Sequence, residues 1–173
     1  MEISCWKIRA LGVSIFSVDR FIDLANFVEV MPAVNQIESH VLFQQKQMRK
    51  ILKKYGTQLM AWSPLVQGRE ELLGNNQLAS IGKKYEKTTA QVAPRFLIQS
   101  GAIAIPKAIH RDRMEENMAI FDFSLTSEEM KELRVCFKSI KVTKQGYRQG
   151  RQRRENRVLS SHTWWQNGGC FST

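Results

Sequence analysis

The residues best suited to chemistry are basic side chains that follow a short apolar run. The run AIAI at 102–105 ends at Pro106, and Lys107, Arg111 and Arg113 follow at the predicted start of a helix. Such a run is typical of a buried parallel strand, which Pro106 cannot continue. Free backbone N–H groups, the helix dipole, a lysine and a guanidinium together suit a phosphate group. The alternative is a solvated helix start with ordinary surface charges.

The elements that must position these residues alternate between strands and helices. Apolar runs predict strands at 10–14, 32–37, 58–62 and 102–105. Helical spacing of apolar residues predicts helices at 18–29, 44–55, 75–85, 88–99 and 111–121. A last helix is predicted after Thr126, which forms a capping-box pattern with Glu129. This order is typical of parallel βαβ units, and we expect four of them in an α/β fold.

Composition excludes several classes of protein. The chain has 173 residues, of which 43% are apolar and 24% are charged, as in a soluble globular protein. No apolar run reaches the roughly 18 residues of a transmembrane helix, and the N-terminus has no signal-peptide pattern, so we expect a cytoplasmic protein without membrane contact. Cys5, Cys136 and Cys170 are widely scattered, so neither a disulfide framework nor a metal site is indicated.

The C-terminal segment 137–173 differs from the rest of the chain. It holds eight of the lysines and arginines against Glu155 alone, so it carries +7 of the net charge of +10. It has no sustained periodicity, and we expect a disordered basic tail. One alternative for the whole chain is a nonenzymatic binding fragment whose tail makes salt-dependent contact with RNA or another polyanion, although a solvated end is expected more. Another alternative for the whole chain is a degenerate translation product without a selected function.

Four stretches of the sequence resemble the motifs of a known protein family and follow one another in the same order as in that family. They are KIRALGVSIFS at 7–17, PAVNQIESH at 32–40, LMAWSPL at 59–65 and IPKAIHRDRMEEN at 105–117. They resemble the aldo-keto reductases, NADPH-dependent oxidoreductases with a (β/α)8 TIM barrel. The resemblance covers only the C-terminal half of such a barrel, which needs about 250 residues. It implies that residues 1–136 form a partial barrel of about four βα units that carries the NADP-binding surface.

The resemblance also implies roles for residues at the strand ends. Ser14 and Gln36 correspond to the residues that hydrogen-bond the nicotinamide carboxamide, and Asn35 belongs to the same Asn-Gln pair. Ile15 replaces the usual Asn and offers no such contact. Trp62 corresponds to an aromatic residue that stacks on the nicotinamide, although a core tryptophan is the alternative. Ser63 and Leu65 follow it in the family pattern and complete the expected cofactor contacts.

The apolar run and basic cluster match the family's adenosine 2′-phosphate loop. Lys107 and Arg113 would clamp the 2′-phosphate, and Glu116 and Asn117 would lie at the adenine. Ala108 replaces the usual Ser and removes one hydroxyl contact. The implied cofactor is NADPH.

The catalytic Tyr, Lys, Asp and His of the family belong to its first half, so no residue of this chain is assigned a catalytic role. Tyr55 and Tyr85 stand at predicted helix ends, and Tyr147 lies in the tail. None of them follows a strand, where barrel chemistry is built. The resemblance implies NADPH-dependent reduction of small aldehydes and ketones, but we expect the chain alone to be inactive. We also expect self-association through open sheet edges.

Overall fold

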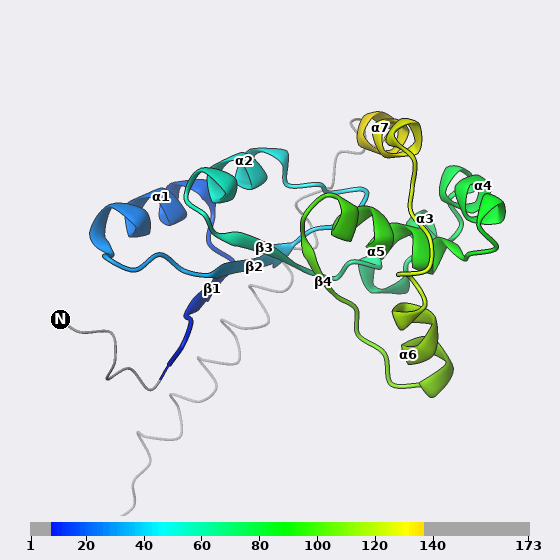
Figure 1. Ribbon diagram of the computed structural model, residues 1–173, viewed down its shortest axis with the longest axis horizontal. Helices are drawn as coiled ribbons and strands as arrows, with labels where there is room; N and C mark the ends of the chain where they lie inside the picture. Colours follow the sequence, from blue (N-terminus) through cyan, green and yellow to red (C-terminus); the bar gives the residue numbers. More distant parts are fainter. Residues whose placement is uncertain (1–7, 137–173) are drawn as a thin grey trace, which may run out of the picture. The chain divides into compact units, whose positions relative to one another are not determined.

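The computed structural model describes residues 8–136, so the predicted tail at 137–173 lies outside the described residues. The strands are β1 (Gly12–Ser14), β2 (Val34–Glu38), β3 (Gln58–Trp62) and β4 (Ile103–Ile105). The helices are α1 (Val18–Phe27), α2 (Lys46–Lys54), the short 3-10 turn η2 (Val66–Gly68), α3 (Glu70–Leu73), α4 (Asn76–Lys84), α5 (Thr89–Gln99), α6 (Arg111–Met118) and α7 (Ser127–Cys136). Figure 1 shows their arrangement.

The strands form one parallel sheet in the order β1-β2-β3-β4, which confirms the predicted α/β fold with successive βα units. Parallel neighbours need a crossover connection, and a helix supplies it between each consecutive pair. The long connection from β3 to β4 holds η2, α3, α4 and α5. Of these, η2 and α3 were not predicted, because four or fewer residues leave too little periodicity to detect.

The two faces of the sheet have different surroundings. One face packs against helices and buries Asn35, Ile37, Leu59 and Ala61. Helix α2 contacts β3 on this side, and α5 contacts β4. Alternate residues along each strand point to the opposite face, which the described residues leave open.

The prediction that the run 102–105 forms a buried strand is wrong for half of its side chains. Ala102 is buried, but Ile103 and Ile105 keep 39% and 38% of their surface exposed. These two isoleucines point to the open face of the sheet, whereas Ala102 and Ala104 point to the helices. An apolar run predicts a strand that could be buried on both faces of the sheet. Whether other elements pack on each face depends on the tertiary structure.

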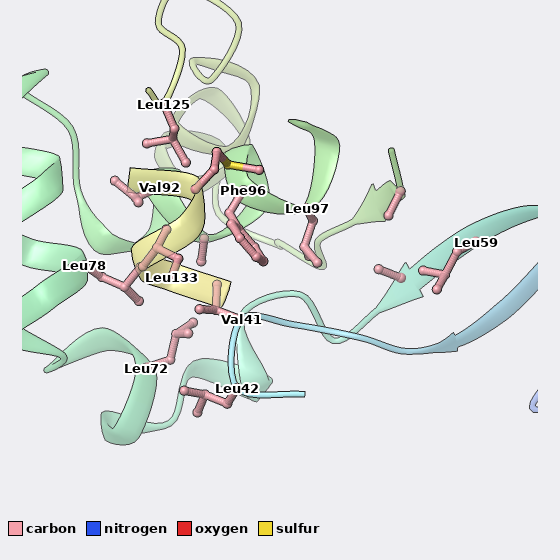
Figure 2. Packing of buried hydrophobic residues seen from close by; sticks show 14 of the residues in the cluster. Val41, Leu42, Leu59, Leu72, Leu78, Val92, Phe96, Leu97, Leu125 and Leu133 are labelled. Atoms are coloured by element: carbon pink, nitrogen blue, oxygen red, sulfur yellow. The ribbon is translucent and has the colours of Figure 1, made fainter. Parts of the chain in front are cut away.

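The main hydrophobic core joins the last helices to one another. Figure 2 shows Leu78 of α4, Val92 and Phe96 of α5 and Leu133 of α7 in one cluster, which extends to Val41 and Leu42 after β2. All of these side chains are at most 7% exposed. Helix α7 therefore belongs to the folded part of the chain. None of the helices in 8–136 is long and apolar enough to cross a membrane.

The predicted capping box at the start of α7 is confirmed. The Glu129 backbone N–H donates to Thr126 Oγ1 at 3.2 Å, and the Thr126 N–H donates to Glu129 Oε2 at 3.0 Å. The same buried carboxylate accepts from Tyr85 Oη at 2.7 Å and from Lys84 Nζ at 2.9 Å. Burial alone would raise the pKa of Glu129, but the hydrogen bonds from Tyr85, Thr126 and Lys84 outweigh it and leave the pKa lowered.

Glu129→Ala is expected to lower the free energy of unfolding by about 2–4 kcal/mol, because it removes a helix cap and a charge-assisted buried hydrogen bond. Glu129→Gln keeps one side-chain oxygen for the capping box but replaces the oxygen that faces Lys84 with an NH2 group, so it should destabilise the chain less than Glu129→Ala. Urea unfolding followed by circular dichroism measures both.

The pH dependence provides the control for this prediction. Because the folded-state pKa of Glu129 lies below its ordinary value of 4.5, the unfolded chain takes up a proton first as the pH falls. The stabilisation is therefore present above pH 4.5 and is lost as the pH falls through the folded-state pKa. The stability difference between wild type and Glu129→Gln should shrink from neutral pH into that acid range. A difference that stays constant would show that the charge plays no part.

Candidate nucleotide-binding site

The register of the sheet brings three of the predicted cofactor residues to its open face. Ser14 pairs with Gln36, and Gln36 pairs with Met60, so their side chains form one row across three strands. Ser14 Oγ donates to the Gln36 carbonyl oxygen at 3.3 Å, and Gln36 Nε2 lies 3.3 Å from Met60 Sδ. Trp62 lies two residues beyond Met60 on the same face of β3. The row therefore presents an amide and a hydroxyl beside a half-exposed indole.

Asn35 is not brought to this face. Its side chain is fully buried on the helix side of the sheet, where Nδ2 donates to the Phe16 carbonyl oxygen at 3.1 Å and lies 3.8 Å from Met48 Sδ of α2. Neighbouring residues of a strand point to opposite faces, so Asn35 and Gln36 cannot both line the open face. Asn35 instead holds the loop that follows Ser14 through its hydrogen bond to Phe16.

Ile15 occupies a strained backbone position directly after Ser14. Its φ is 62°, in the left-handed region that β-branched residues rarely adopt and asparagine adopts more readily. Its N–H donates to the Gln36 carbonyl oxygen at 2.9 Å, which holds this conformation in place. The Asn that the family pattern has at this position would suit both the backbone and a polar ligand, whereas Ile15 leaves an exposed apolar side chain.

The loop after β3 holds several residues in the left-handed region. Ser63, Val66, Gln67 and Gly68 have φ values of 54°, 51°, 57° and 75°. The Val66 N–H donates to the Ser63 carbonyl oxygen at 2.9 Å and closes a tight turn. The Ser63 Oγ atom is buried and has no hydrogen-bond partner within 8–136. A buried hydroxyl without a partner costs free energy, so this oxygen is suited to a ligand or water contact. Leu65, half-buried in the same turn, packs against the core.

Two of the three basic side chains that follow β4 could bind an anionic ligand. Lys107 and Arg113 are exposed, and no carboxylate of the described chain forms an ion pair with either of them. Arg111 differs, because its Nε lies 2.8 Å from Glu115 Oε1. Since β4 ends at the same edge of the sheet as the other parallel strands, the cluster follows the edge that Trp62 occupies on β3.

Glu116 and Asn117 lie one turn further along α6, where both are half-buried. Glu116 Oε1 already accepts a hydrogen bond from Thr88 Oγ1 at 2.6 Å. This contact uses part of its capacity to bind a ligand. Asn117 stands next to it in the last turn of the helix.

Gln91 is a positioning residue that the sequence analysis did not identify. Helix α6 buries none of its own residues, and Gln91 of α5 holds it by donating from Nε2 to the carbonyl oxygens of Glu116 at 3.2 Å and Ala119 at 3.0 Å. Gln91 also forms a capping box with Thr88. The spacing Thr88-x-x-Gln91 is the signal that could have found it.

A family comparison agrees with this arrangement. The model named "Aldo/keto reductase family" matches residues 7–138. The chain belongs to the aldo/keto reductase family. Among curated relatives, glyoxal reductase of Bacillus subtilis is 44% identical over 136 residues, which are 79% of this chain and 49% of that protein. A 9,11-endoperoxide prostaglandin H2 reductase of Trypanosoma cruzi is 42% identical over 73% of this chain and 45% of its own length.

Solved structures of aldo-keto reductases share the fold. MGS-M4, from a deep-sea metagenome library, superposes with a TM-score of 0.72 at 40% identity and covers 74% of this chain and 48% of its own. A mutant of Gox0644 in complex with NADPH superposes with a TM-score of 0.68 at 34% identity over 72% of this chain and 45% of that one. The chain thus spans about half the length of the aldo-keto reductases that it matches.

The two tyrosines in the described part of this aldo-keto reductase chain have structural contacts. Tyr85 Oη donates to Glu129 Oε2, and this hydrogen bond raises the pKa of the phenol. Tyr55 packs edge-on against Phe21 with ring centroids 6.0 Å apart. Neither residue lies at the C-terminal end of a strand, and Tyr147 is outside the described residues. Within 8–136 no group of three His, Cys, Asp or Glu residues is placed to hold a metal ion.

Proposed function

We propose that this chain provides the NADP(H)-binding surface of an aldo-keto reductase barrel. The observation that carries the proposal is that Ser14, Gln36 and Trp62 share the open face of the sheet. Lys107 and Arg113, which form no ion pair within 8–136, follow the last strand at the same edge. Relatives bear the names of reductases, and one solved relative is a complex with NADPH. The corresponding activity of a whole protein is NADPH-dependent reduction of small aldehydes and ketones to alcohols.

Each part of the surface suits a different part of the cofactor. Gln36 offers amide donor and acceptor groups to the nicotinamide carboxamide, and Trp62 offers a flat ring for stacking. The Lys107 ammonium group offers a positive charge to the 2′-phosphate, and the planar Arg113 guanidinium offers several N–H donors. Bound NADPH would supply the hydride, and these residues would bind and orient it.

The second part of the proposal is that this chain alone does not reduce carbonyl compounds. Carbonyl reduction needs a proton donor beside the hydride, and a general acid must reach hydrogen-bond distance of the carbonyl oxygen. Tyr85 is hydrogen-bonded to Glu129 among the helices, and Tyr55 packs against Phe21. Of the histidines, His40 is buried beside Glu38 at 3.7 Å, and His110 stands before α6 in the loop that carries Lys107.

Direct titration tests cofactor binding. The full chain is expected to bind NADPH with saturable heat in isothermal titration calorimetry, and Trp62→Leu should weaken binding by about three- to tenfold through loss of stacking. Trp6→Leu is the matched control, since Trp6 precedes β1 and belongs to no predicted contact. Absence of any saturable heat from the folded chain would contradict the proposal.

We also expect the chain to self-associate through the sheet. The outer edges of β1 and β4 have no partner strand within 8–136, and Ile15, Ile103 and Ile105 are exposed apolar residues beside them. Unpaired strand edges with apolar neighbours favour pairing with another chain. Light scattering should give a mass above that of one chain at micromolar concentration, and Ile103→Lys with Ile105→Lys should shift it toward the monomer. A monomeric wild-type chain would contradict this expectation.

A further inference from the structure

A second basic site lies on the helix side of the sheet. Helix α2, the C-terminal end of α5 and helix α7 line an open pocket of about 580 Å³. Among the described residues, its lining includes five cationic side chains and no carboxylate; the cations are Lys46, Arg49, Lys50, Lys131 and Arg134. Like charges repel one another, so five cations around one cavity favour an anion between them.

Two buried polar atoms of residues that line this pocket lack hydrogen-bond partners within 8–136. Arg49 Nε donates to the Gln44 carbonyl oxygen at 2.8 Å, and Nη1 donates to the Ser100 carbonyl oxygen at 2.9 Å, which fixes the guanidinium plane. Its Nη2 atom is buried without a hydrogen-bond partner in the described part of the chain, as is Ser100 Oγ. Burial, and then the charge of Arg134, lowers the pKa of Arg49. A bound anion would offset the repulsion between Arg49 and Arg134.

From this geometry we infer that the pocket binds an anion with two or more phosphate groups. Its volume exceeds what a single phosphate fills, and Phe96 and Val135 add an apolar wall beside the cations. The chain's own segment 138–173 carries +7, so it has the wrong sign to neutralise the pocket. The site is separate from the proposed cofactor surface, because α2 and α5 contact the sheet on the face opposite Gln36 and Trp62.

The test is a calorimetric titration of the full chain with inorganic pyrophosphate at low salt. The wild-type chain is expected to show a saturable site that Lys131→Gln with Arg134→Gln weakens about tenfold or more, because two charge-assisted contacts are lost. Both side chains are exposed, so the double variant should keep the fold, which circular dichroism checks. Hydrogen exchange should show pyrophosphate-dependent protection of residues 44–50 and 96–101.

Two controls separate this site from other basic surfaces. Lys54→Gln with Lys83→Gln removes the same charge from exposed positions outside the pocket and should change binding less than twofold. Lys107→Met with Arg113→Ala removes the proposed 2′-phosphate clamp and should leave the pyrophosphate site intact, so the two proposals can fail separately. Equal weakening by the pocket and control doubles, or protection confined to other segments, would overturn the inference.

Discussion

The purified full chain is expected to show no oxidation of NADPH above background with any aldehyde or ketone. General acid–base catalysis contributes about 10²–10⁴-fold to such reactions, and a hydride without a matched proton donor does not complete the reduction. The hydrogen bond from Tyr85 to Glu129 raises the pKa of that phenol, which is opposite to the change that a tyrosine proton donor needs at neutral pH. Dimerisation would double the cofactor surface without adding a donor.

NADPH absorbance, followed with a panel of small aldehydes, measures this directly. The clamp double variant Lys107→Met with Arg113→Ala serves as the control, because a contaminating reductase would be as active in its preparation as in wild type. Activity that purifies with the wild-type chain and falls with the double variant would overturn the prediction. It would mean that a residue other than Tyr55 and Tyr85 donates the proton.

The full chain is expected to bind NADPH about 100-fold more tightly than NADH. Only NADPH carries the 2′-phosphate, and two charge-assisted contacts from Lys107 and Arg113 are together worth about 3 kcal/mol, which corresponds to that ratio. Both side chains are exposed and have no ion-pair partner in 8–136, so neither must first break a protein contact. Lys107→Met with Arg113→Ala should abolish the preference by weakening NADPH binding and leaving NADH binding unchanged.

Arg111→Ala is a matched control for the cofactor preference. Arg111 lies two residues before Arg113 on α6, but its guanidinium is paired with Glu115 at 2.8 Å. Its removal should therefore leave the NADPH to NADH ratio within about twofold, since the lost pair is an exposed one. Calorimetric titration with both cofactors, and a salt series, checks each variant. Equal affinity of the wild-type chain for both cofactors would contradict the clamp.

Local sequence patterns were enough to predict the main elements. The strand at 58–62 was predicted with its observed bounds, and the Thr126 capping box appeared as expected. Helix ends were less accurate: α1 stops at Phe27 and α6 at Met118, short of the predicted 29 and 121. The last residues of a helix have few stabilising contacts of their own, so tertiary packing decides where it ends.

The roles of the candidate site residues stay predictions, and the structure shows only where their side chains lie. The family motifs predicted Ser14, Gln36 and Trp62 as cofactor contacts, and these side chains lie on the open face of the sheet. The motifs also predicted Asn35, whose side chain points to the helix side, toward Met48. The spacing Thr88-x-x-Gln91 indicates a capping box, but it does not indicate that Gln91 also hydrogen-bonds the carbonyl oxygens of Glu116 and Ala119. A hydrogen bond between residues 25 or more positions apart produces no periodic pattern in the sequence, so local motifs cannot predict it.

The order of residues was enough to assign the class of this protein: an α/β chain with parallel βα units and the motifs of an aldo-keto reductase. These properties follow from local periodicity, capping and motif spacing, each of which acts over a few residues. The tertiary structure was needed to show that Ile103 and Ile105 stay exposed. It was also needed to show that Arg49 and Arg134 line the same basic pocket. Burial and electrostatic potential sum over all neighbours in space, and those neighbours come from elements far apart in the chain.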